Sequence, residues 1–147
     1  MSECTEKPIR DSFPDAIIQS SETDGALSLK LAPAALLRVC ELLQSQLGFD
    51  YLADVTAIDW QDRIEVVCRM TALASNEKIV LRVDLDRTNP EIDSITSVWK
   101  GADYQEREVY DLMGVTFKGH PDLRRILLPE EWEGHPLRKD YVIPNQD

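Results

Sequence analysis

The chain has 147 residues, 43% hydrophobic and 29% charged, and these proportions exclude wholesale disorder and fit one globular domain. Lys and Arg number 16 against 27 Asp and Glu, and the net charge of -11 disfavours nucleic acid and anionic membrane surfaces as partners. No run approaches the ~20 apolar residues of a membrane-spanning helix, and the N-terminus lacks the apolar region of a signal peptide. We therefore expect a cytosolic protein without direct membrane insertion.

The chain begins with a predicted flexible leader and a β-hairpin. Residues 1–14 are polar and contain two prolines, so we expect a flexible N-terminal leader. Apolar runs at 16–18 and 26–31 flank the turn signal Asp24-Gly25. Alternating apolar residues on both sides of such a turn predict a β-hairpin.

A helix is predicted next, between Pro33 and Gly48. Proline is favoured at the first helical position, and glycine is favoured just past the last one. Apolar residues at i, i+4, i+7 and i+11 predict one buried face. They are Leu36, Cys40, Leu43 and Leu47. We expect Cys40 to be a small buried apolar residue.

Three strands are predicted at 50–60, 64–73 and 78–86. The second and third alternate apolar and polar residues, which indicates one buried face and one wet face, as in antiparallel sheets. The connections between the three strands are too short for parallel crossovers. We therefore expect an antiparallel meander.

A short helical turn and a second helix complete the predicted domain. Ser94 or Ser97 is expected to cap the turn, and the helix runs from 102 to 113 and ends at Gly114. The predicted fold class is α+β, a two-layer α/β sandwich with a mostly antiparallel sheet of four or five strands and helices on one face. The domain would cover 15–117, followed by an extended irregular C-terminal tail at 118–147.

Cofactor sites are not predicted in this chain. The cysteines, Cys4, Cys40 and Cys68, are widely spaced and form no C-x-x-C motif, which argues against disulfides and against an iron–sulfur cluster. With two histidines a zinc site is improbable. No glycine-rich phosphate-binding loop is present.

The second predicted helix carries a run of charged residues, Glu106, Arg107, Glu108 and Asp111. Arg107 and Asp111 are four residues apart and are predicted to pair on one face. The alternative is a solvent-exposed charged face, which is the usual arrangement of such runs. Each exposed ion pair would then contribute only tenths of a kcal/mol to stability.

The 30 residues from 118 to 147 contain four prolines but too many apolar residues for a disordered tail. Trp132 and several leucines lie among basic residues, a composition typical of interface hot spots. The basic residues are Arg124, Arg125, Arg138 and Lys139. Because residues 104–140 carry eight acidic and six basic residues, a protein partner is favoured over nucleic acid. We expect this tail to become ordered on its partner.

Two Gly-His-Pro triplets contain His120 and His135. A general base in an independent enzyme is one interpretation, but nothing nearby resembles an activated nucleophile. We favour histidines that stabilise turns by hydrogen bonds, and we expect no independent catalysis.

Long motifs in this part of the chain resemble a known family. The segments at 106–117, 119–127 and 132–141 closely resemble the signature of the subunit designated C in respiratory NADH–quinone oxidoreductase (complex I), and 54–59 and 97–99 are similar as well. The resemblance covers about 33–143. The signature residues, expected at subunit interfaces, are Glu106, Arg107, Glu108, Asp111, Gly114, His120, Pro121, Arg124, Arg125, Trp132, His135, Pro136, Leu137, Arg138, Lys139 and Asp140.

The resemblance implies a cofactor-free scaffold subunit of the peripheral arm, on the cytoplasmic side of the cell membrane. Its partners would be subunits D, B and I, of which the first is the hydrogenase-like subunit that lines the quinone site. FMN, iron–sulfur clusters and quinone would be bound by other subunits of an ion-pumping enzyme that oxidises NADH or another donor. The alternative is the corresponding subunit of a ferredoxin-dependent photosynthetic complex or of a membrane-bound hydrogenase.

Two arginines are predicted to matter most for assembly. We expect Arg107 and Arg138 to be desolvated and paired with carboxylates. Removing either charge should then impair assembly more than it destabilises the free domain.

Overall fold

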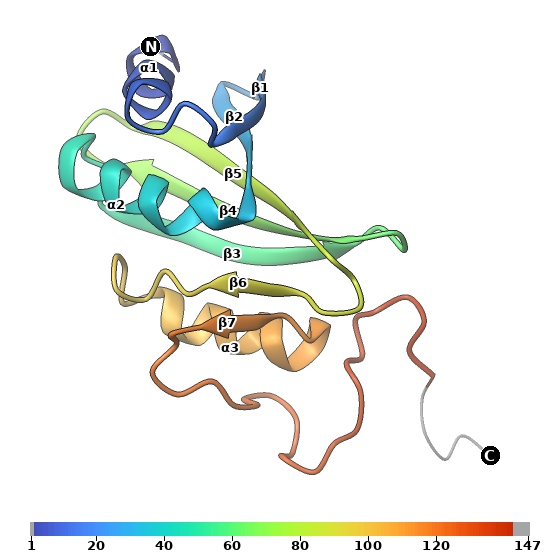
Figure 1. Cartoon of the computed structure of the whole chain (residues 1–147). Coiled ribbons are helices and arrows are strands. Elements are labelled where there is room, and N and C mark those ends of the chain that lie inside the picture. The colour runs from blue at the N-terminus through green and yellow to red at the C-terminus, as the bar shows by residue number, and fades with distance from the viewer. Residues whose placement is uncertain (1, 143–147) are drawn as a thin grey trace.

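The structure, a computed structural model, describes residues 2–142, and the side chains from residue 5 onward. A five-stranded sheet forms the centre of the fold, with helices packed against it and an irregular C-terminal segment at one end (Figure 1). This confirms the predicted α+β class. Residues 143–147 of the predicted tail lie outside the described residues.

The predicted hairpin is present as strands β1 (Ile17–Thr23) and β2 (Ala26–Leu31), which pair antiparallel. Asp24 and Gly25 have φ values of 53° and 79°. Two consecutive residues with positive φ form the type I′ turn that Asp-Gly favours.

The predicted first helix consists of a 3-10 turn, η1 (Pro33–Ala35), and helix α2 (Leu36–Gln46). Its buried face includes the predicted Leu36, Cys40 and Leu43. Gly48 follows the helix with a φ of 78°, a conformation that glycine adopts without strain. Cys40 is fully buried, as predicted for a small apolar residue.

The predicted meander is present as β3 (Tyr51–Asp59), β4 (Ile64–Ala72) and β5 (Glu77–Leu85), all antiparallel. The complete sheet has the order β1-β2-β5-β4-β3, and β2 pairs with β5 in parallel. Sequence reasoning did not predict this parallel pair, because the two strands are separated by α2, β3 and β4. One face of the sheet is apolar and forms the core with α2.

Helix α3 (Ala102–Met113) has the bounds predicted for it and ends at Gly114. A turn precedes it, and the Ser94 hydroxyl accepts a hydrogen bond from the N–H of Thr96 at 3.1 Å, consistent with the predicted cap. Strands β6 (Glu91–Asp93) and β7 (Thr116–Lys118) form a small parallel sheet that was not predicted, since each has only three residues. In Figure 1, β6, β7 and α3 lie beyond the edge strand β3.

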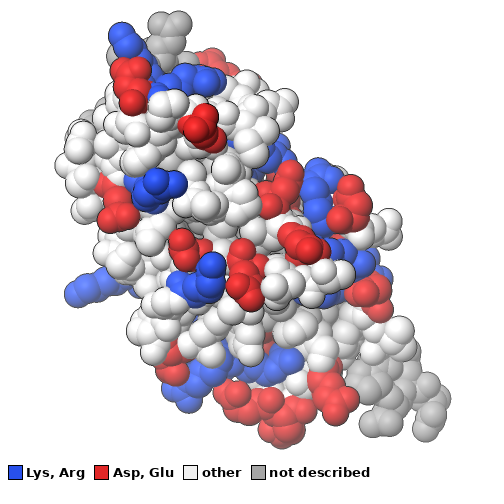
Figure 2. Space-filling model, in the orientation of Figure 1, with Lys and Arg blue, Asp and Glu red and all other residues white. Residues whose placement is uncertain are grey.

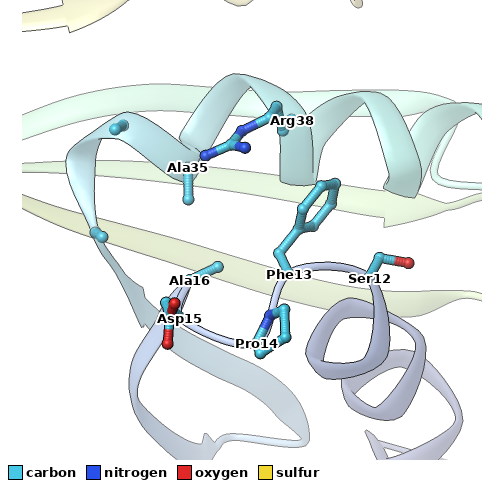
Figure 3. A pocket seen from close by; sticks show the side chains of 9 residues that line it. Ser12, Phe13, Pro14, Asp15, Ala16, Ala35 and Arg38 are labelled. Atoms are coloured by element: carbon cyan, nitrogen blue, oxygen red, sulfur yellow. The ribbon is translucent and has the colours of Figure 1, made fainter.

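The prediction of a flexible leader is wrong for Ser2–Ser12, which form helix α1. Ile9 is fully buried in the core, and the Thr5 hydroxyl donates a hydrogen bond to Glu77 at 2.5 Å. Phe13 follows the helix and points toward α2, with the Arg38 guanidinium 5.5 Å from its ring centre (Figure 3). These tertiary contacts stabilise a short polar helix whose own sequence predicts little helical structure.

Candidate functional site

The candidate site is the C-terminal segment, residues 119–142, together with helix α3. The segment contains no helix or strand and runs past α3 and then toward the sheet (Figure 1). Without a helix or strand, the backbone N–H and C=O groups of this segment need hydrogen-bond partners outside regular secondary structure. Two carboxylates, the end of α3 and the two histidines supply them.

Asp111 is the first of the two carboxylates, and it is fully buried. Its Oδ1 accepts a hydrogen bond from Arg125 Nη1 at 2.7 Å, and its Oδ2 accepts from three consecutive backbone N–H groups at 2.8–3.2 Å. The three groups belong to Ile126, Leu127 and Leu128. Burial raises the pKa of Asp111, but these bonds outweigh it and hold the pKa below its ordinary value. Asp111 therefore stays ionised and determines the local path of the segment.

Arg125 connects this turn to the second Gly-His-Pro triplet. Its side chain is only 10% exposed, and besides the Asp111 carboxylate it donates to the carbonyls of Asp111, at 3.0 Å, and Gly134, at 2.8 Å. A planar guanidinium with several donors suits such a junction. Sequence reasoning placed Arg125 among residues that contact a partner, whereas here it binds its own chain.

The segment also caps the end of α3. The last carbonyls of a helix have no partners within it. His135 Nδ1 donates to the carbonyl of Asp111 at 3.0 Å, Leu137 N to that of Leu112 at 2.9 Å, and Arg138 Nε to that of Met113 at 2.7 Å. Positive charge at a helix C-terminus is also favoured by the helix dipole.

Gly114 makes this close approach possible. A Cβ placed there would lie 2.7–2.9 Å from His135 and Arg138 side-chain atoms, and the residue has a φ of 78°. Both features require glycine.

His120 stabilises a turn, as predicted. The N–H of Asp122 donates to His120 Nδ1 at 2.9 Å, so Nε2 carries the proton and donates to the carbonyl of Asp103 at 3.0 Å. The side chain is fully buried. This contact ties the start of the segment to the first turn of α3.

Asp59, at the end of β3, is the second carboxylate that holds the segment. It accepts hydrogen bonds from the N–H groups of Lys139 and Gln61 and from Arg87 Nη2, each at 2.8 Å. Arg87 also lies 3.2 Å from Asp140. Burial raises the pKa of Asp59, but the two N–H groups and Arg87 lower it to about 2. Sequence reasoning assigned Asp59 no role, and its presence in the 54–59 motif was the only available signal.

Glu106 is not part of a solvated charged face, contrary to that interpretation. It is fully buried and accepts hydrogen bonds from the Ser94 hydroxyl at 2.6 Å and the Ile95 N–H at 2.8 Å. Burial raises the pKa of Glu106 above its ordinary value, against the effect of these bonds. Glu106 thus fixes α3 to the turn that follows β6.

The predicted pair between Arg107 and Asp111 is wrong. Arg107 does not pair with Asp111 but donates to the carbonyls of Arg124 and Arg125, both at 3.3 Å. The reason is that Asp111 is turned inward, where Arg125 reaches it from the C-terminal segment. Among the described residues, Arg138 bonds the Met113 carbonyl and forms no ion pair.

The remaining signature residues lie around this framework. Trp132 is half-buried and donates to the Tyr141 hydroxyl at 3.0 Å. His135 and Pro136 are half-buried. The exposed members are Glu108, Pro121, Arg124, Leu137, Lys139 and Asp140. All of the signature residues therefore lie on α3, just after it, or on the C-terminal segment.

Large apolar side chains remain exposed on the same surface. Tyr104 is 64% exposed, Leu127 57%, Leu137 60% and Val142 81%. We call α3 and residues 119–142, with these side chains, the α3–tail surface. Exposed apolar and aromatic residues beside arginines mark protein interfaces.

Acidic and basic side chains lie intermixed on the face of the molecule seen in Figure 2. Nucleic-acid binding would instead require a continuous basic face. Among the described residues, no helix has the length and apolar character needed to cross a membrane. Within the same part of the chain, no three His, Cys, Asp or Glu side chains are grouped as metal ligands would be.

The chain is similar to several known proteins. The family model described as respiratory-chain NADH dehydrogenase, 30 Kd subunit, matches residues 29–147. The NADH-quinone oxidoreductase subunit designated C of Moorella thermoacetica (strain ATCC 39073 / JCM 9320) is 45% identical over 137 residues, which are 91% of this chain and 90% of that relative. A solved trypsin-resistant fragment (1-134) of Nqo5 has a TM-score of 0.70 and 26% identity, and the match covers 80% of this chain and 98% of that one.

A second solved structure is similar in fold over a larger share of the chain. It is the membrane-bound sulfane sulfur reductase, an archaeal respiratory membrane complex, with a TM-score of 0.78 and 21% identity. The match covers 97% of this chain and 86% of that one. At this identity the likeness concerns the fold alone.

Proposed function

Since the chain belongs to the family of the respiratory-chain NADH dehydrogenase 30 Kd subunit, whose curated relatives are subunits of NADH-quinone oxidoreductase, we propose that it is a scaffold subunit of such an enzyme complex. It would hold neighbouring subunits in place while electrons pass to quinone. It would perform no redox step itself.

The single observation that carries this proposal is the α3–tail surface. Two buried carboxylates and the end of α3 hold an irregular segment in a defined path, and that path leaves Leu127, Leu137 and Val142 exposed. A preformed segment loses little conformational entropy on binding. More of the free energy gained by burying its exposed apolar groups therefore appears as affinity. This is a feature of a docking surface.

The proposed partner on this surface is the hydrogenase-like subunit that lines the quinone site, with subunits B and I as further neighbours. The chain would lie in the peripheral arm, on the cytoplasmic side of the membrane, and associate with the membrane only through these subunits. FMN and iron–sulfur clusters would be held by the other subunits.

The protonation state of the two buried cysteines supports the proposal that this chain holds no redox centre of its own. Cys40 and Cys68 both lie in the apolar core. Burial raises the pKa of Cys40 well above its ordinary value and that of Cys68 to about 12. The thiolate is the form that ligates a cluster, and these thiols remain protonated and apolar.

The proposal can be tested in cells that make the whole complex. The double variant Leu127→Ser, Leu137→Ser removes two exposed side chains from the α3–tail surface. Hot-spot residues contribute ~2 kcal/mol or more, so we expect recovery of the hydrogenase-like subunit with the tagged chain to fall by at least about tenfold. NADH:quinone activity of the membranes should fall in parallel.

The matched control is Ile18→Ser, Leu73→Ser, since these side chains are 66% and 61% exposed but lie on β1 and after β4. This variant should assemble normally. Equal losses from the two double variants would contradict the α3–tail surface as the docking site. Normal assembly of both variants with lost electron transfer would contradict a scaffold role.

A further inference from the structure

The second face of the five-stranded sheet carries a groove that the proposed function does not use. It has a volume of about 690 Å³, and its lining comes from β1 to β5 and the β1–β2 turn, with no residue from a helix. The α3–tail surface contributes nothing to it. Among the described residues, no helix therefore covers this groove.

The charge of the groove is opposite to that of the chain. Arg69, Lys78 and Arg82 line it together with one acidic residue, Asp24. The chain as a whole has 27 acidic and 16 basic residues. An excess of basic side chains in one groove of an acidic protein attracts an acidic ligand and steers its approach.

The three basic side chains are available to a ligand. Lys78 is exposed and has no ion pair among the described residues. Arg69 pairs with Asp54 at 3.2 Å, but both side chains are at least 42% exposed, and such surface pairs contribute little. Arg82 lies 3.7 Å from Glu65, and its buried Nε has no hydrogen-bond partner in the described part of the chain. The Arg82 side chain as a whole is 28% exposed and lines the groove.

The groove is preformed. Its lining includes Ser28, Met70 and Ile79, which are 5%, 1% and 1% exposed. Beside the groove, Lys30 Nζ donates to Glu65 at 2.7 Å and to Asp84 at 3.0 Å, and Glu65 lies 3.7 Å from Arg82. Side chains held in place in this way lower the entropic cost of binding.

The spacing of the basic side chains matches an extended peptide. Lys78 and Arg82 lie on the same face of β5, four residues apart, which is about 13 Å at ~3.3 Å per residue. Arg69 lies on β4 opposite Val80, midway between them. In an extended peptide, side chains at i, i+2 and i+4 point to one side and span the same distance.

From this match we propose that the groove binds an extended segment of a partner protein with an acidic residue at every second position. Three successive carboxylates would lie over Lys78, Arg69 and Arg82. The residues between them would face away from the sheet. This interface is separate from the α3–tail surface and does not depend on the role proposed for that surface.

The probe is the peptide Glu-Ser-Glu-Ser-Glu-Ser-Glu, titrated into the full-length ¹⁵N-labelled chain at low and at physiological ionic strength. We expect amide shifts confined to strands β2, β4 and β5, with weaker binding at the higher salt because exposed charges are screened. A peptide of the same composition with its four glutamates in one block should bind about fivefold more weakly, because it cannot match the spacing. The corresponding Lys-Ser peptide should not bind.

Matched variants identify the side chains involved. Lys78→Gln and Arg69→Gln should each weaken binding about fivefold. Lys100→Gln, an exposed lysine before α3, should leave it unchanged. In the assembled complex, a photoreactive residue at Thr71 should cross-link to a segment with acidic residues at alternate positions.

Several results would overturn the proposal. The first is an absence of binding at low salt. The second is that the peptide with its glutamates in one block, or a short RNA, binds as tightly as the alternating peptide. The others are amide shifts confined to α3 and residues 119–142, or a loss of binding in Lys100→Gln equal to that in Lys78→Gln. The absence of a cross-link from residue 71, or a cross-linked segment without alternating acidic residues, would overturn it as well.

Discussion

The sheet domain and the C-terminal segment reach defined structures by different interactions. In the domain, apolar side chains of the sheet and α2 are buried together, and strands such as β4 and β5 pair along nine residues each. In residues 119–142, no helix or strand is present, and the path follows from hydrogen bonds to Asp111, Asp59 and the end of α3. The domain is stabilised by burial, whereas the segment is stabilised by a few charged groups.

This difference has a functional meaning. Apolar burial is non-directional and tolerates conservative changes of side chain, but charge-assisted hydrogen bonds fix direction and position. A segment held by such bonds can leave its own apolar side chains exposed and still follow one path. The domain should therefore determine global stability, while the segment should determine recognition.

The largest effect on stability should come from Leu81→Ala in the domain. Leu81 is fully buried on β5, in the middle of the sheet, and a leucine-to-alanine change in a core lowers the free energy of unfolding by about 2–5 kcal/mol. Urea denaturation measures this loss. Leu137→Ala, at a side chain that is 60% exposed, is the control and should change the free energy by less than about 1 kcal/mol. Similar losses for both would mean that the segment belongs to the core.

The second largest effect should come from Asp111→Asn, and it should be local. The change leaves the shape of the side chain but removes the charge that binds Arg125 and three backbone N–H groups. Hydrogen bonds to charged groups contribute about 1.5–3 kcal/mol each. The segment should detach before the contributions of all these hydrogen bonds are lost. We therefore expect the free energy of unfolding to fall by at most about 3 kcal/mol. Amide exchange at 126–128 and trypsin cleavage after Arg125 should accelerate, while exchange in β4 and β5 stays slow.

The control for Asp111→Asn is Asp122→Asn in the same segment. The Asp122 side chain is 55% exposed and pairs with Arg124 on the surface, so its change should have little effect. If Asp111→Asn speeds exchange in the sheet as much as in the segment, the two regions unfold together as one unit.

The same difference explains what could be predicted from the sequence. Alternation in β4 and β5, the repeat in α2 and the glycines at turns depend on local sequence, and these elements were predicted correctly. Helix α1, the parallel pairing of β2 with β5 and the partner of Arg125 depend on residues distant in sequence. The burial of Glu106 is another example, because its charge suggested exposure and only the turn at Ser94 satisfies it. Composition predicts that the C-terminal segment binds a partner, but it could not reveal that Arg125 and Arg138 bind their own chain.

A third, smaller effect is the difference in stability between two glycine variants, which separates backbone strain from contact with the segment. Gly114→Ala and Gly119→Ala both place a side chain at a positive φ, 78° and 84°, which costs about 1–2 kcal/mol in either case. A Cβ at Gly119 meets nothing within 4 Å, whereas one at Gly114 overlaps His135 and Arg138. Overpacking adds ~1–3 kcal/mol or displaces the segment. Gly114→Ala should thus lower stability further than Gly119→Ala and speed exchange of the Leu137 amide. Equal effects would show that the segment does not pack on Gly114.

The smallest effect should be the pH dependence of the contact at Asp59. Its pKa is lowered from 3.8 to about 2 in the folded chain, so the contact is fully stabilising above about pH 4 and is lost as the pH falls toward 2. Asp59 itself is buried, but Arg87 and Asp140, which share the contact, are 22% and 65% exposed and are screened by solvent, so we expect a loss on the order of 1 kcal/mol. The amide resonance of Lys139 should follow this titration, since its N–H donates to Asp59. Asp59→Asn should abolish the titration and leave the Leu127 amide, which depends on Asp111, unchanged. If the Leu127 amide also shifts in Asp59→Asn at neutral pH, the two carboxylates act as one unit, and the segment has a single anchor rather than two.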